Sequence, residues 1–87
     1  MYQIFFSRQA DKDKNLLKQS GLEQKTKAIL KILMTDPFQK PPSYEKLLGD
    51  LSGLYSRRIN RQHRIVYSVD IQEKVVKILR MWTHYEL

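Results

Sequence analysis

The stretch Leu51–Tyr67, LSGLYSRRINRQHRIVY, decides the fold of this chain. Apolar and aromatic residues alternate there with polar ones, and this period of two predicts strands over Leu54–Ile59 and Arg64–Val69. The run also carries four arginines and a histidine: Arg57, Arg58, Arg61, Arg64 and His63. Guanidinium groups held on a sheet can bind a phosphate through two parallel hydrogen bonds. The stretch therefore predicts both a β-sheet and a phosphate-binding surface.

Two helices are predicted before this stretch. Ser7 is a suitable cap for a helix over Arg8–Gln19, which ends at Gly21. A second helix is predicted over Leu22–Met34, where the apolar residues fall on one stripe. The Asp36-Pro37 pair disfavours helix at its first residue and begins a proline-containing loop.

Shorter elements complete the predicted order. Alternation predicts a strand at Tyr2–Phe6, a helical turn is predicted at Tyr44–Leu48, and apolar residues predict a last strand over Lys74–Trp82. The order β-α-α-β-β-β indicates an α+β fold, in which a mostly antiparallel sheet has two N-terminal helices packed on one face. A chain of 87 residues is expected to form one domain over residues 1–87.

The composition points to an anionic partner. Sixteen Lys and Arg stand against nine Asp and Glu, so the net charge is +7 and the pI is near 9.8. Such an excess favours nucleic acid or another polyanion. The absence of cysteine excludes disulfides, thiol catalysis and thiolate metal sites. No stretch has the roughly 20 apolar residues of a membrane span, and no signal peptide is recognisable, so we expect a cytoplasmic protein without membrane contact.

Strand alternation predicts which side chains meet. Ile65, Tyr67 and Val69 share one face of their strand, and Arg64 lies on the other. If the first face packs on the helices, Arg64 points to the exposed side of the sheet. Arg58 joins it if the register of the neighbouring strand allows, and the two would form a phosphate clamp. The alternative is a pair of solvated arginines that keep the sheet soluble.

The histidines and carboxylates carry little signal by themselves. Neither His63 nor His84 has a metal-binding partner at helical or strand spacing, and there is no acidic cluster, so we expect no metal and no cofactor. His63 is expected to form a hydrogen bond or pack, not to catalyse. Without other information, Glu45 is interpreted as a surface carboxylate and His84 as a terminal residue without a role.

The segment Glu45–Tyr67, with its LSG, SRRI and HRIVY motifs, and the later His84-Tyr85 pair resemble the YoeB/Txe family of the RelE superfamily. The likeness covers essentially the full length. Members of this family are toxins of type II toxin–antitoxin modules that cleave mRNA on the ribosome. The resemblance therefore implies a RelE-like fold and a metal-independent endoribonuclease that acts in the ribosomal A site by general acid–base catalysis, without a cofactor.

The same resemblance implies roles for individual residues. The general base of the family falls on Glu45, its phosphate-stabilising arginine on Arg64 and its general acid on His84. Arg58 matches a further phosphate-contacting position, and Tyr85 matches a supporting tyrosine.

Other positions depart from the family pattern or fall outside it. Family members use a lysine a few residues after the base, and Leu48 occupies that place here. Either the contact is lost or Lys46 supplies it. Arg57 and Arg61 are assigned to docking or solubility. The additional Glu86 and Leu87 follow the His-Tyr pair.

The resemblance also implies partners. These are a YefM/Axe-type antitoxin, the 70S ribosome with its rRNA and mRNA, and operator DNA only through the antitoxin; a homodimer is compatible with it. Two other functions remain open at this stage. One is a catalytically silent RelE-like protein that binds RNA or a partner, and the other is a corepressor subunit of an antitoxin–DNA complex.

Overall fold

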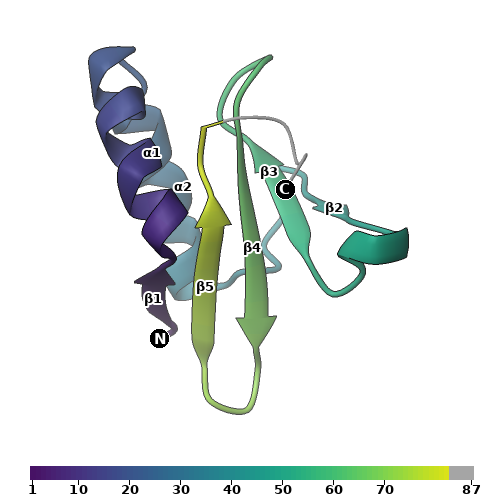
Figure 1. Cartoon of the computed structure of the whole chain (residues 1–87). Helices are drawn as coiled ribbons and strands as arrows, with labels where there is room; N and C mark the ends of the chain where they lie inside the picture. The colour runs from purple at the N-terminus through teal and green to yellow at the C-terminus, as the bar shows by residue number, and fades with distance from the viewer. Residues whose placement is uncertain (83–87) are drawn as a thin grey trace.

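A five-stranded sheet with two helices forms the protein, and the computed structural model describes residues 1–82 of it. The elements are β1 (Gln3–Phe6), α1 (Arg8–Gln19), α2 (Glu23–Thr35), β2 (Glu45–Lys46), the 3-10 helix η1 (Gly49–Leu51), β3 (Tyr55–Arg58), β4 (Arg64–Asp70) and β5 (Val75–Arg80). The strand order is β1-β5-β4-β3-β2, where β1 is parallel to β5 and the other neighbours are antiparallel (Figure 1). The predicted α+β fold with a mostly antiparallel sheet is confirmed.

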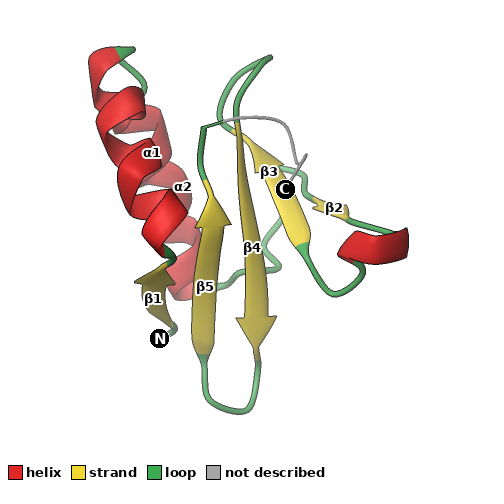
Figure 2. Ribbon diagram, viewed as in Figure 1, coloured by secondary structure: helices red, strands yellow, loops and turns green. Residues whose placement is uncertain are grey.

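The two helices begin and end close to their predicted limits. The Ser7 hydroxyl accepts a hydrogen bond from the Ala10 amide at 3.0 Å and so caps α1. Gly21 follows α1 with φ +72°, a conformation that glycine adopts without steric cost. The helix α2 ends at Thr35, directly before the Asp36-Pro37 pair. Both helices lie beside the β1–β5 end of the sheet (Figure 2).

The main core lies between the helices and one face of β4 and β5. Most of its members are apolar side chains of α1, α2, β4 and β5, among them Leu17, Leu33, Ile65, Tyr67, Val76 and Ile78; Ile59 and Met81, which follow β3 and β5, complete it. Val69 packs against this cluster and is partly buried. The condition that Ile65, Tyr67 and Val69 face the helices is therefore met, and Arg64 lies on the opposite face of β4.

An aromatic cluster covers the same face farther along the sheet, at β3. Phe38 and Tyr44 come from the loop after α2, Tyr55 from β3 and Tyr67 from β4. The Tyr55 ring lies 5.5 Å from Phe38, 5.8 Å from Tyr44 and 5.7 Å from Tyr67, measured between centroids. Aromatic pairs at these distances contribute about 0.5–1.5 kcal/mol beyond their buried area. The proline-containing loop is therefore packed onto the sheet although it has no regular structure.

The predicted helical turn at Tyr44–Leu48 was wrong. Glu45 and Lys46 instead form the edge strand β2, which pairs antiparallel with Ser56 and Tyr55. Backbone pairing with β3 and packing of the Tyr44 ring outweigh the local helical preference, as tertiary contacts often do for short segments. The only helical turn here is η1, which begins at Gly49 with φ +63°.

Candidate active site

Three strands bring a carboxylate, a hydroxyl and two guanidinium groups to one face of the sheet. Glu45 of β2 lies opposite Ser56 of β3, and Arg58 of β3 lies opposite Arg64 of β4. Because side chains two residues apart on a strand share a face, Ser56 and Arg58 point to the same side. The predicted phosphate clamp of Arg58 and Arg64 required that the register of β3 and β4 place the two residues side by side. The register does align Arg58 with Arg64.

These side chains line a small hollow of about 120 Å³. Its lining residues are Pro42, Ser43, Tyr44, Glu45, Ser56, Arg58 and Arg64. Nη1 of Arg64 lies 3.3 Å from Oε1 of Glu45, a contact between opposite charges. The Arg64 side chain is 11 % exposed and the Glu45 side chain 54 % exposed, so a recessed guanidinium meets an accessible carboxylate. A phosphate group is complementary to this charge arrangement.

The expectation that Arg64 points to the exposed side of the sheet needs correction. The face is the predicted one, but Arg64 and its neighbour Val66 are buried on it. Only Arg58 is exposed among the arginines that line the hollow. The candidate site is thus a recess and not an open charged surface.

The assignment of Arg57 to docking or solubility was wrong. Arg57 is 1 % exposed, and its guanidinium donates hydrogen bonds of 2.7, 3.0 and 2.9 Å to the carbonyl oxygens of Pro42, Pro37 and Gln39. Its Nε also donates to the Tyr67 hydroxyl at 3.0 Å. Arg57 therefore fastens the loop that leads to Glu45, which makes it a structural residue on the face opposite the hollow.

The Tyr67 phenol belongs to the same buried network. Its hydroxyl accepts from Arg57 and donates to the Pro37 carbonyl at 3.3 Å. Burial raises the pKa of Tyr67, and the Arg57 guanidinium partly offsets this rise. The phenol consequently stays protonated and acts as a fixed bridge between β4 and the loop.

Lys46 does not reach the hollow. It pairs with Tyr55, and alternation along β2 puts its side chain on the face opposite that of Glu45. Leu48, which stands at the place of the family lysine, is 83 % exposed and is not part of the lining. The suggested substitution of Lys46 for that lysine has no support in the geometry.

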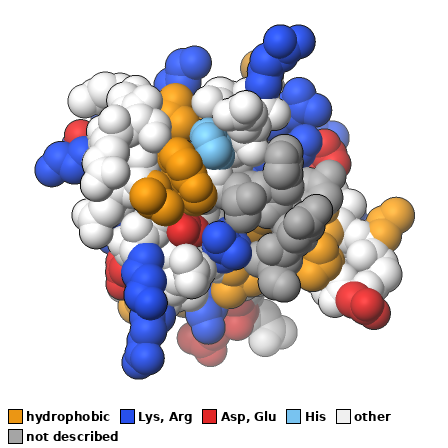
Figure 3. Space-filling model, turned by 45° about the horizontal axis from the view of Figure 1, so that its top comes forward, with side chains coloured by type: hydrophobic (Ala, Val, Ile, Leu, Met, Phe, Trp, Pro, Cys, Tyr) orange, Lys and Arg blue, Asp and Glu red, His pale blue; other side chains and the backbone are white. Residues whose placement is uncertain are grey.

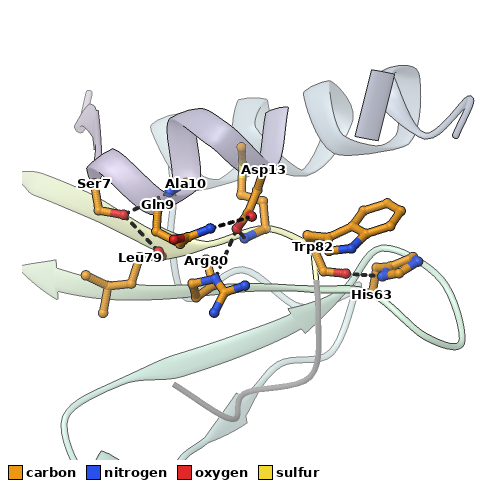
Figure 4. Close-up of polar contacts among 9 residues, drawn as sticks. Ser7, Gln9, Ala10, Asp13, His63, Leu79, Arg80 and Trp82 are labelled. Carbon is orange, nitrogen blue, oxygen red and sulfur yellow. Dashed lines mark hydrogen bonds and ion pairs between the residues drawn. The ribbon is translucent and has the colours of Figure 1, made fainter. Parts of the chain in front are cut away.

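Polar contacts hold the chain in place up to Trp82 (Figure 4). The buried carboxylate of Asp13 in α1 accepts hydrogen bonds from Nε of Arg80 at 3.1 Å and from the Met81 amide at 3.0 Å. The Nδ1–H of His63 donates to the Trp82 carbonyl, and the two rings stack with centroids 3.9 Å apart. The expected hydrogen-bonding or packing role of His63 is confirmed. His84 and Tyr85 lie outside the described residues.

Sequence patterns did not single out Ser56 as part of the site. Its side chain lies between Glu45 and the arginine pair, and it is 1 % exposed. Alternation places Ser56 on the face of Arg58, but only the strand register shows that it lies opposite Glu45, and an uncharged serine gives no further signal.

Other features of the described residues set limits on the site. No group of three or more His, Cys, Asp or Glu side chains that could hold a metal occurs in residues 1–82, and no helix in that part is long and apolar enough to cross a membrane.

A larger hollow of about 250 Å³ lies between α1 and α2, but its lining is mostly apolar and lysine side chains. Lys and Arg side chains project at several points around one face of the molecule (Figure 3).

A family model described as a YoeB-like toxin of bacterial type II toxin–antitoxin systems matches residues 6–85. The chain belongs to this family. It is 36 % identical over 74 residues to the toxin YoeB of Synechocystis, a match that covers 85 % of this chain and 77 % of that protein.

Solved YoeB structures agree with the assignment. The YoeB dimer from Staphylococcus aureus has a TM-score of 0.81 and 36 % identity, with 97 % of this chain and 98 % of that chain covered. YoeB in the heterotetrameric YoeB–YefM complex from the same organism has a TM-score of 0.80 and 35 % identity, with 98 % and 99 % covered. The resemblance to the YoeB/Txe family is confirmed, and the chain is a toxin of the type II toxin–antitoxin class.

Proposed function

We propose that this YoeB-family toxin is a ribosome-dependent endoribonuclease that cleaves mRNA in the A site. The observation that supports the proposal is the recess in which the Glu45 carboxylate lies 3.3 Å from the Arg64 guanidinium, with Arg58 aligned beside Arg64. A base and two phosphate-binding groups within one hollow are what cleavage by the RNA's own 2′-hydroxyl requires.

In the proposed reaction Glu45 takes the proton of the 2′-hydroxyl. The 2′-oxygen then attacks the adjacent phosphorus, and the bond from phosphorus to the 5′-oxygen breaks. Arg64 and Arg58 stabilise the negative charge that builds on the phosphoryl oxygens. The products are a 2′,3′-cyclic phosphate and a 5′-hydroxyl, so neither a metal nor a covalent intermediate is needed.

The general acid is assigned to His84 and a supporting role to Tyr85, both by family resemblance. His84 would protonate the departing 5′-oxygen, which requires the imidazolium form before reaction. Negative phosphates nearby would favour that form.

The partners follow from family membership. A YefM/Axe-type antitoxin would bind and neutralise the toxin, and the complex would bind operator DNA through the antitoxin. A homodimer is a further expected assembly. The net charge of +7 would favour docking on rRNA in the cytoplasm, so cleavage should weaken as salt is raised.

The decisive test is Glu45→Gln, which keeps the shape of the side chain but removes the base. Cleavage of mRNA on purified ribosomes, mapped by primer extension, should fall about 10²- to 10⁴-fold. Glu73→Gln is the matched control, because Glu73 lies in the exposed turn between β4 and β5, away from the hollow. His84→Ala should show a similar loss.

Two outcomes would overturn the proposal. Wild-type protein that leaves mRNA intact on ribosomes would favour a silent RNA-binding protein or a corepressor subunit. Full activity of both Glu45→Gln and His84→Ala would refute the acid–base mechanism, although the assignment as a ribonuclease would stand.

A further inference from the structure

Ser56 presents a buried hydroxyl at the base of the candidate site. The residue is 1 % exposed, and its Oγ has no hydrogen-bond partner among the residues that the structure describes. Buried hydroxyl groups in native proteins nearly always have a partner, because desolvation without one costs free energy. An exception inside a candidate active site calls for a functional reason.

The position of this hydroxyl is central to the recess. Ser56 lies directly opposite Glu45 on one side and Val66 on the other, and two residues from Arg58 along β3. Val66 is apolar and fully buried, so it offers no polar partner. A ligand held between the carboxylate and the guanidinium pair would pass over Ser56.

We infer that Ser56 contacts the substrate and donates a hydrogen bond to a non-bridging oxygen of the scissile phosphate. The inference rests on the proposed function. Phosphoryl oxygens only accept hydrogen bonds, and the serine hydroxyl has a donor that nothing in residues 1–82 uses. A fixed neutral donor there adds to the charge stabilisation by Arg64 and Arg58.

The exposure of the site residues suggests how the phosphate reaches Ser56. The Glu45 carboxylate is half-exposed and contacts Arg64 across the recess at 3.3 Å. An incoming phosphate would take over the guanidinium from Glu45, since it presents the same kind of acceptor oxygens. Release of this contact frees the carboxylate for the 2′-hydroxyl and places the phosphate in the hollow that Ser56 also lines.

A substitution separates this role from simple packing. Ser56→Ala should lower the rate constant for ribosome-dependent cleavage about tenfold, because one donor is lost while two guanidinium groups remain. Its melting temperature should equal or exceed that of the wild type, since an unpartnered buried hydroxyl is removed. Ser68→Ala, in the neighbouring strand outside the lining, is the matched control and should leave cleavage unchanged.

Replacing a non-bridging oxygen of the scissile phosphate by sulfur tests whether Ser56 donates its hydrogen bond to that oxygen. A phosphorothioate in place of a non-bridging oxygen weakens hydrogen bonds to that position. Wild-type protein should therefore slow markedly with one of the two phosphorothioate isomers, and Ser56→Ala should slow less with the same isomer. Equal slowing in both proteins, or a Ser56→Ala variant that cleaves like the wild type or melts earlier than it, would overturn the inference.

A binding measurement keeps this inference separate from the proposed function. A trinucleotide with 2′-deoxyribose at the scissile position cannot be cleaved, and Ser56→Ala should bind it several-fold more weakly than wild-type protein. If wild-type protein does not cut mRNA but this difference is found, the proposed reaction fails and the phosphate contact stands. Equal affinity of the two proteins refutes the contact whether or not mRNA is cut.

Discussion

Arg57 and Arg58 are neighbours on β3 and have the same side chain, but they lie on opposite faces of the sheet. Arg57 is buried and hydrogen-bonded to three loop carbonyls and Tyr67, whereas Arg58 is exposed at the recess opposite Arg64. Alternation along the strand separates them. The pair shows that one face of β3 holds the loop in position and that the other face carries the candidate chemistry.

The largest expected difference between the two faces is in stability. Arg57→Met should lower the free energy of unfolding by about 3–5 kcal/mol, because it removes four hydrogen bonds and leaves buried or partly buried acceptors without donors. Arg58→Met should change it by less than about 0.5 kcal/mol, as is usual for an exposed position. Urea denaturation of both variants measures this. Equal losses would mean that Arg57 is not the fastening residue that its contacts indicate.

The elements that local patterns specify were predicted well. Ser7 and Gly21 mark the ends of α1 through capping and a left-handed turn, and both signals depend on only a few neighbouring residues. The shared face of Ile65 and Tyr67 follows from strand alternation, and the structure shows that this face packs on the helices. These features need no knowledge of distant contacts.

The missed features depend on contacts between distant parts of the chain. The acceptors of Arg57 lie 15, 18 and 20 residues before it, so alternation could place Arg57 on the face opposite Arg58 but could not show that it is buried and hydrogen-bonded. The edge strand β2 exists because Glu45 pairs with Ser56, and the importance of Ser56 appears only once that register is known. The grouping of Glu45 with Arg64 came from family resemblance, and strand pairing supplies its physical basis.

An intermediate loss of stability is expected when the Tyr67 hydroxyl, which joins Arg57 to the Pro37 carbonyl, is removed. Tyr67→Phe removes one hydrogen bond from Arg57 and one to Pro37, which should cost about 1–2 kcal/mol at neutral pH. Burial raises the pKa of Tyr67 in the folded state above the unfolded value of about 10. The folded protein therefore holds this proton more tightly, and the stability linked to it is complete below pH 10 and is lost as the pH rises through the raised pKa.

The pH dependence of urea denaturation distinguishes this account from a simple packing loss. Between about pH 9 and pH 11 the wild type should lose stability more steeply than Tyr67→Phe, because the variant lacks the titrating phenol. The other tyrosines are common to both proteins and cancel in the comparison. Parallel curves would show that ionisation of Tyr67 is not coupled to unfolding.

The smallest effect on cleavage is expected at Lys46, which lies on the face opposite the recess and so tests the division of roles between the two faces directly. Lys46→Ala should leave ribosome-dependent cleavage within about threefold of wild type, because an exposed charge on the face opposite Glu45 acts only through screened solvent. Arg58→Ala, on the face of the recess, should lower cleavage about tenfold. A loss at Lys46 as large as that at Arg58 would contradict this division of roles between the two faces.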